Sequence, residues 1–297
     1  MSSAQGWNAT VAGLALAALG ACASGVSAQP PGAPSPEAAE AGQAAPTGPE
    51  TGEGDKTGEG DETALSRAQM RKVIDRAPPL ERANFWAREH AENPDDVETS
   101  LRFGRALRDI GSHERAAEIA SQATILHPEN GELYLLMGRA LASQDKHEKA
   151  RGALLRAVML MPEDQDALAA LGLAHDRLGN HESAQTAYRQ ALDIAPDRVA
   201  TRSNLGLSLA LSGDLDAAEA ELRKAAEHPG ASVNVQQNLA LVLGLKGDYE
   251  AARSVSEGAP EDVIEQNLET LKAFRGDAPR PDRADEAALR GAMVTDQ

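Results

Sequence analysis

Ser203 to Ala252 reads SNLGLSLALSGDLDAAEAELRKAAEHPGASVNVQQNLALVLGLKGDYEAA, and one pattern occurs in it twice. A leucine followed by a small residue stands at Leu205-Gly206 and again 34 residues later at Leu239-Ala240. Upstream the same step gives Phe103-Gly104, Met137-Gly138 and Leu171-Gly172, and alanines recur in phase at Ala116, Ala150, Ala184, Ala218 and Ala252. Antiparallel helices approach closely only where side chains are small, so this pattern predicts five stacked helical hairpins.

A 34-residue period is typical of tetratricopeptide repeats. Turn positions carry Gly111, Asp145, Gly179, Gly213 and Gly247, and Pro128, Pro162 and Pro196 end the second helices of the first three units. We therefore expect an all-α, right-handed superhelical solenoid with five tetratricopeptide units at residues 97–258. Terminal units leave an apolar face, so residues 64–96 are predicted to form an N-terminal helical cap and residues 259–275 a C-terminal capping helix.

Charge excludes one class of partner. The 297 residues include 46 Asp plus Glu against 29 Lys plus Arg, a formal net charge of −17. Nucleic-acid binding needs the opposite sign, so we expect no nucleic-acid partner.

The N-terminus has the features of an export signal. Residues 11–21 form an apolar run too short to span a membrane, and residues 1–21 are predicted to be a signal peptide. The run ends in Leu19-Gly20-Ala21-Cys22, which resembles the bacterial lipobox and predicts lipidation of Cys22 and anchoring in the membrane. Cleavage after Ala28 would instead release a soluble periplasmic protein. The first basic residue is Lys56, so whether Met1 is the true start stays open.

Two segments lack apolar periodicity. Residues 22–63 are rich in Pro, Gly, Ala and acid, with near-duplicates TGEGDK and TGEGDE from Thr51 and Thr57, and are expected to be a disordered acidic tether. Residues 276–297 are expected to be a mostly disordered tail.

The Ser203–Ala252 run, with the EDVIEQNLETLKA segment after it, resembles the TadD family of tetratricopeptide lipoproteins in tight-adherence (Flp) pilus assembly. Its most specific parts are Pro229–Ala231 and the QNLALVLGLKG segment from Gln237 to Gly247. The resemblance implies a periplasm-facing, outer-membrane lipoprotein that assists assembly or stability of the pilus secretin. The alternative is a soluble periplasmic scaffold for cell-envelope proteins.

The inner side of the first helices is where such arrays bind other proteins. In register, the first three units give this surface charged residues, Asp176 among them. Arg105 and Arg139 would either pair with a partner carboxylate or form a solvated face balanced by Glu98 and Glu132. In the last two units the surface turns to leucine, which would either receive an amphipathic segment or pack internally. The candidate groove residues are Arg105, Arg139, Arg177, Leu207, Leu211, Gln237, Leu241 and Leu245.

No residues for catalysis are visible. His113, His147 and His181 stand 34 apart, too far to share a metal ion, and are predicted to replace a packing aromatic such as Tyr249. No nucleophile motif or phosphate-binding loop is found. We therefore expect a non-enzymatic adaptor without metal, cofactor or small-molecule substrate. An enzyme with residues hidden in the solenoid is the other class to distinguish, by a cluster of titratable groups in the groove.

Overall fold

The computed structural model describes residues 67–256 and 258–276, and every regular element in these two ranges is helical. An N-terminal pair of helices precedes five hairpins and a last helix. In chain order they are α2 (Arg67–Val73), the 3₁₀ turn η1 (Ile74–Arg76), α3 (Pro79–Glu92), α4 (Val97–Asp109), α5 (His113–Leu126), α6 (Gly131–Ala142), α7 (His147–Leu160), α8 (Gln165–Arg177), α9 (His181–Ile194), α10 (Val199–Leu211), α11 (Leu215–Ala226), α12 (Val233–Lys246), α13 (Tyr249–Val255) and α14 (Glu261–Arg275). The predicted all-α repeat solenoid is confirmed. The predicted signal peptide, Cys22, the acidic tether and nearly all of the tail lie outside the described residues.

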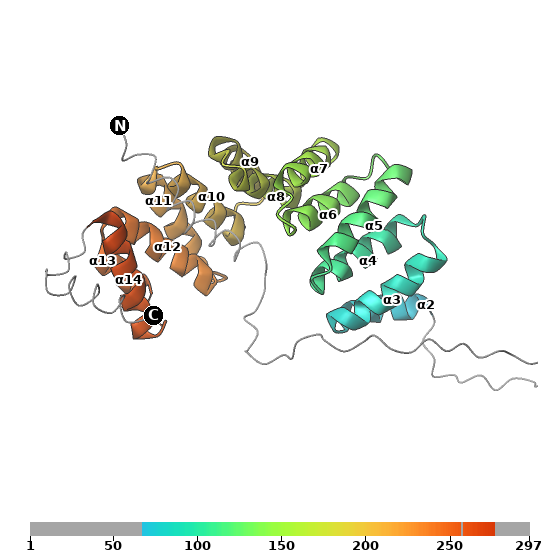
Figure 1. Ribbon diagram of the computed structural model, residues 1–297, viewed down its shortest axis with the longest axis horizontal. Coiled ribbons are helices and arrows are strands. Elements are labelled where there is room, and N and C mark those ends of the chain that lie inside the picture. The colour runs from blue at the N-terminus through green and yellow to red at the C-terminus, as the bar shows by residue number, and fades with distance from the viewer. Residues whose placement is uncertain (1–66, 257, 277–297) are drawn as a thin grey trace, which may run out of the picture.

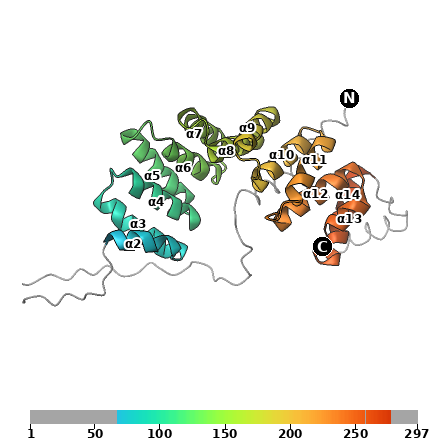
Figure 2. The same ribbon diagram turned by 180° about the vertical axis from the view of Figure 1, so that it is seen from behind.

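The hairpins are arranged in an arch, with α2 at one end and α14 at the other (Figure 1). In both views α6 and α8 lie on the inner side and α7 and α9 on the outer side (Figure 2). Among the described residues, no helix is both long and apolar enough to span a membrane.

Each hairpin turns through one residue in the left-handed region. Gly111, Gly179, Gly213 and Gly247 have φ between +75° and +94°, and Asp145 takes the same place with φ +57°. Asp tolerates this region better than most side chains, so the second hairpin keeps the turn without glycine.

The small residues of the repeat mark the helix crossings. A Cβ on Gly138 would lie 2.5 Å from Leu154 Cγ, and one on Gly172 would lie 2.6 Å from the ring of Tyr188. Both contacts are far inside van der Waals distance, so any larger residue there would push the two helices of the hairpin apart.

First helices of the first three units begin with a side-chain cap. Asp96, Asn130 and Asp164 accept hydrogen bonds from backbone N–H groups three residues on, at 3.0, 3.1 and 2.7 Å. In the fourth unit this position is Arg198, which cannot accept such a bond, and the start of α10 has no side-chain cap.

Both ends of the array are covered. Trp86 of α3 is 2% exposed and belongs to the apolar cluster of the first unit. At the other end, Leu271 of α14 packs with Leu207, Leu211 and Leu245 in one buried cluster. The end helices therefore cover the apolar faces of the first and last units, as repeat arrays require.

Candidate protein-binding groove

A groove of about 500 Å³ runs across the first helices of the first four units. We call it the central groove. It is lined by charged side chains and small apolar ones: Arg108, Arg139, Ala142, Ser143, Asp145, His147, Leu154, Asp166, Ala169, Ala170, Leu173, Ala174, Arg177, Arg198, Ala200, Thr201 and Asn204. Four arginines face two aspartates, so the groove is positively charged in a chain whose net charge is −17.

Asp166 holds two of these arginines. Arg198 forms an ion pair with its carboxylate, and Arg139 donates to its backbone carbonyl oxygen at 3.3 Å while lying 3.8 Å from Oδ1. One carboxylate thus serves two guanidinium groups, which leaves N–H donors of both without a protein acceptor.

The other two arginines have no carboxylate partner. Among the described residues, the side chains of Arg108 and Arg177 form no hydrogen bond or ion pair, and Arg108 Nε is buried without a partner. Burial lowers the pKa of Arg108, and the nearby Arg139 lowers it further. Burial also lowers the pKa of Arg139, although Asp166 opposes this. Buried like charges side by side disfavour the empty groove and favour an anion between them.

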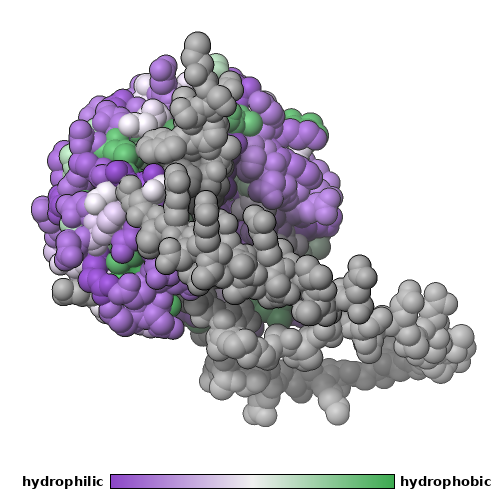
Figure 3. All heavy atoms as spheres, turned by 60° about the vertical axis from the view of Figure 1, so that its left-hand side comes forward, coloured by the Kyte–Doolittle hydropathy of each residue, from purple (hydrophilic) through white to green (hydrophobic). Residues whose placement is uncertain are grey.

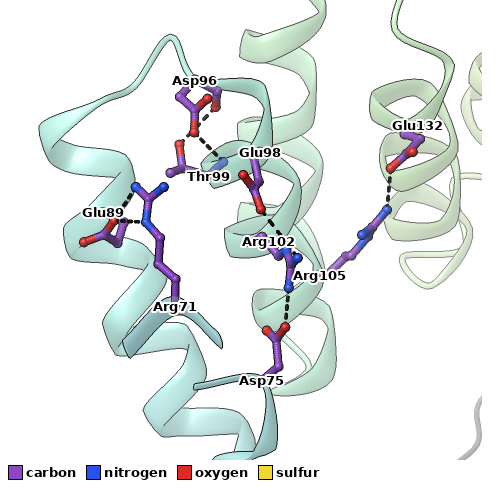
Figure 4. A network of polar contacts seen from close by, with 9 residues as sticks. All are labelled: Arg71, Asp75, Glu89, Asp96, Glu98, Thr99, Arg102, Arg105 and Glu132. Carbon is purple, nitrogen blue, oxygen red and sulfur yellow. Dashed lines mark hydrogen bonds and ion pairs between the residues drawn. The ribbon is translucent and has the colours of Figure 1, made fainter. Parts of the chain in front are cut away.

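Arg105, one turn before Arg108, is placed differently. It is exposed and donates to Glu132 at 2.7 Å, and it does not line the groove (Figure 4). The same figure shows Arg102 held between Glu98 and Asp75. For Arg105 the solvated, balanced alternative therefore holds, whereas Arg139 and Arg177 line the groove as predicted candidates.

Asn204 supplies a polar group at the floor. The residue is only 7% exposed, it lines the groove, and its Oδ1 is buried without a hydrogen-bond partner among the described residues. An unpaired buried amide costs about 1–3 kcal/mol, which a ligand N–H could recover.

Asn204 and Arg198 line the groove but are not among the candidate groove residues that the sequence predicts. The sequence did contain a sign of Arg198. Helix-capping residues recur every 34 positions at Asp96, Asn130 and Asp164, and the next such position holds arginine instead. Loss of a capping residue costs about 1 kcal/mol, and such local conflicts concentrate at functional positions.

The predicted apolar groove is mostly core. Leu207, Leu211 and Leu245 are 0%, 8% and 1% exposed, packed against each other and Leu271. Their sequence register is right, but α14 lies over them. For these three leucines, internal packing is the correct alternative, and a partner cannot reach them.

Gln237 and Leu241 line a separate, smaller pocket of about 300 Å³ between α12, α13 and α14, which we call the C-terminal pocket. It lies beside α13, which has seven residues where the other second helices have 12 to 14. None of its lining residues is charged: Asn234, Gln237, Asn238, Ala240, Leu241, Ala252, Ser256, Ile264, Asn267, Leu268, Thr270 and Leu271. The surface at this end of the array is largely hydrophilic, with small separate apolar areas (Figure 3).

A buried polar cluster joins the third and fourth units. Asp176 is 1% exposed, so its predicted place on the inner surface is wrong. Its Oδ1 accepts from Ser208 Oγ at 2.7 Å and lies 2.9 Å from His181 Nδ1. His181 is thus hydrogen-bonded rather than a plain packing residue.

This cluster does not have the geometry of a catalytic triad, since the serine donates to the carboxylate and not to the imidazole. Within the described residues, no group of three or more His, Cys, Asp or Glu side chains could hold a metal ion. What the central groove can do chemically is bind an anion.

Comparisons with known proteins give the same fold. Residues 101–168 and 169–232 match the tetratricopeptide repeat family. No curated protein matches the sequence. A tetratricopeptide repeat protein from Parabacteroides merdae is 16% identical with a TM-score of 0.56, over 71% of this chain and 85% of that one.

Two further solved structures are similar over shorter stretches. MamA is 27% identical with a TM-score of 0.49, over 56% of this chain and 95% of that one. A thermophilic protein, TTC0263 from Thermus thermophilus, is 21% identical with a TM-score of 0.49, over 59% and 97%. The family match, the 34-residue hairpins and their stacking agree: residues 101–232 consist of tetratricopeptide repeats and belong to an all-helical repeat solenoid.

Proposed function

We propose that this protein is a non-enzymatic scaffold whose central groove binds an acidic segment of a protein partner. The observation that carries the proposal is the pair Arg108 and Arg177, which line the groove without a carboxylate partner among the described residues. Arginine binds carboxylates through two parallel hydrogen bonds, and the charge makes each bond stronger. Asn204 Oδ1 can accept a main-chain N–H from the same segment.

For its place in the cell, we propose a lipid-anchored adaptor of Tad/Flp pilus assembly on the periplasmic side of the outer membrane. The lipobox-like sequence at Cys22 and the family resemblance of residues 203–252 support it. The partner would be the pilus secretin or another component of that machinery. Mass spectrometry of the mature N-terminus tests the anchor: diacylated Cys22 is expected, and a free N-terminus at Gln29 would favour the soluble periplasmic alternative.

The groove is tested with two fluorescent peptides, (Glu-Gly)₆ and (Lys-Gly)₆, in an anisotropy titration. We expect the full chain to bind only the acidic peptide. Arg108→Gln with Arg177→Gln should weaken binding at least tenfold, because each charge-assisted hydrogen bond contributes about 1.5–3 kcal/mol.

The matched control is Arg189→Gln, which removes an exposed arginine of α9 that does not line the groove. It should change the affinity less than twofold. Equal weakening by the control, or unchanged binding by the folded double variant, would show that the acidic peptide binds elsewhere. Pull-down of purified secretin by the same variants then tests the partner.

A further inference from the structure

The chain carries, outside its described residues, a segment whose charge complements the central groove. Residues 50–62 read ETGEGDKTGEGDE and contain six carboxylates against the single Lys56. Glycine makes up most of the remainder, so side chains would not obstruct entry into a groove floored by Ala169, Ala170 and Ala174.

From this complementarity we propose that residues 50–62 occupy the central groove when no partner is bound, and that a partner's acidic segment displaces them. The inference rests on the proposed function, since both ligands use the same arginines. It identifies the chain's own tether as the first ligand of the site and makes partner binding competitive.

The segment is long enough to reach. It is followed by four residues before α2 begins at Arg67, and α2 and α3 lie beside the first unit, where Arg108 begins the groove. The seventeen residues 50–66 would have an r.m.s. span of about 23 Å as a random coil. Neighbouring packed helices are about 10 Å apart, so this span reaches the first helices of the first two units, where Arg108 and Arg139 lie.

The opposite terminus is a poorer occupant. Residues 277–297 hold five acidic residues interleaved with Arg280, Arg283 and Arg290, and they start from the far end of the arch. Charge density and distance therefore both favour the N-terminal segment.

Tethering compensates for a weak contact. A flexible link of this length gives an effective concentration on the order of 1 mM. A segment with an intrinsic Kd of about 0.1 mM would then weaken the apparent affinity of a competing peptide about tenfold. A stronger partner segment still binds, whereas weak acidic ligands are excluded.

The test replaces all six carboxylates in the full chain by amides: Glu50→Gln, Glu53→Gln, Asp55→Asn, Glu59→Gln, Asp61→Asn and Glu62→Gln. The amide variant should bind (Glu-Gly)₆ about tenfold more tightly than the unmodified chain. Equal affinities would overturn the inference and leave the proposed function standing. Failure of the peptide to bind either protein would instead overturn the proposed function.

Removal of negative charge could by itself strengthen the binding of an anionic peptide. The control therefore neutralises the five acids of the tail, Asp277, Asp282, Asp285, Glu286 and Asp296, which reduces the net negative charge by a similar amount. At physiological salt the Debye length is about 8 Å, so this variant should bind like the unmodified chain. A gain as large as that of the tether variant would overturn the proposal.

A photo-crosslinking amino acid introduced in place of Gly54 or Gly58 tests directly whether the segment contacts the central groove. We expect crosslinks to the groove-lining parts of α6, α8 and α10, and their loss in the Arg108→Gln, Arg177→Gln variant. Crosslinks confined to the outer helices α5, α7 and α9 would contradict the proposal.

Discussion

The central groove and the C-terminal pocket are built on the same 34-residue hairpin but offer opposite chemistry. The groove has four arginines and about 500 Å³, whereas the pocket has about 300 Å³ and no charged side chain. This chemical difference arises at individual positions of the 34-residue repeat. The register position that holds Arg139 in the groove holds Leu241 in the pocket, three units later. Partner chemistry in such an array is therefore set by a few substitutions along one face, while the hairpin geometry stays constant.

The largest expected effect separates core leucines from pocket leucines. Leu207→Ala should lower the free energy of unfolding by about 2–5 kcal/mol, because Leu207 is fully buried and its removal leaves a cavity. Leu241→Ala, one unit later in the same register but half-buried, should cost about 1 kcal/mol. Urea denaturation measures both. Similar losses would mean that the two leucines have the same role and that the distinction between core and pocket is wrong.

Sequence reasoning reached the solenoid because the repeat is local and regular: glycine, alanine and proline at fixed spacing determine a hairpin without knowledge of its neighbours. It reached Arg139 and Arg177 because register places a residue on a face. It could not tell that Leu207, Leu211 and Leu245 are covered, since that depends on where α14 packs. The sequence also did not predict the C-terminal pocket, because nothing in the repeat pattern shows that α13 ends after seven residues.

The buried polar cluster of Asp176, Ser208 and His181, which we call the polar seam, joins the third and fourth units, and breaking it should give the next largest effect. Asp176→Ala removes the partner of His181 Nδ1 and the 2.7 Å acceptor of Ser208 Oγ, which leaves the buried Ser208 hydroxyl only its 3.4 Å contact with the His181 carbonyl oxygen. We expect a loss of about 1–3 kcal/mol in the free energy of unfolding.

Asp193→Ala is the matched control for this seam, because it removes an exposed carboxylate of α9. It should change stability by less than about 0.5 kcal/mol. If Asp176→Ala were as mild as this control, the seam would contribute nothing to holding the third and fourth units together.

Salt should distinguish the two regions as binding sites. Raising ionic strength from 0.05 to 0.5 M shortens the Debye length from about 14 to about 4 Å, so affinity of (Glu-Gly)₆ for the central groove should fall on the order of tenfold. An uncharged apolar peptide in the C-terminal pocket should bind equally well at both salt concentrations. Salt-independent binding of the acidic peptide would contradict an ionic groove.

The smallest expected effect is on the pH dependence of stability, and it arises in the part of the array that carries the central groove. His175 of α8 stands where other units have Leu107, Leu141, Leu209 and Leu243, and its Nδ1 is buried without a hydrogen-bond partner among the described residues. Burial lowers its pKa below the model-peptide value of 6.5, Arg151 lowers it further, and Asp176 and Glu148 oppose the shift. Burial likewise lowers the pKa of His90 and His113.

A histidine with a lowered pKa binds fewer protons in the folded than in the unfolded state, so the free energy of unfolding falls as pH drops through about 6.5 and levels off once the folded form is also protonated. We expect the thermal midpoint to fall by a few degrees between pH 7.5 and 5.5. His175→Leu should reduce this fall and raise the midpoint at pH 5.5 more than at pH 7.5, since it installs the residue that the leucine-rich units use at the same place. The residual pH dependence would then belong to His90 and His113. An equal fall in the variant and the unmodified chain would mean that His175 is already as easily protonated in the folded array as in the unfolded chain.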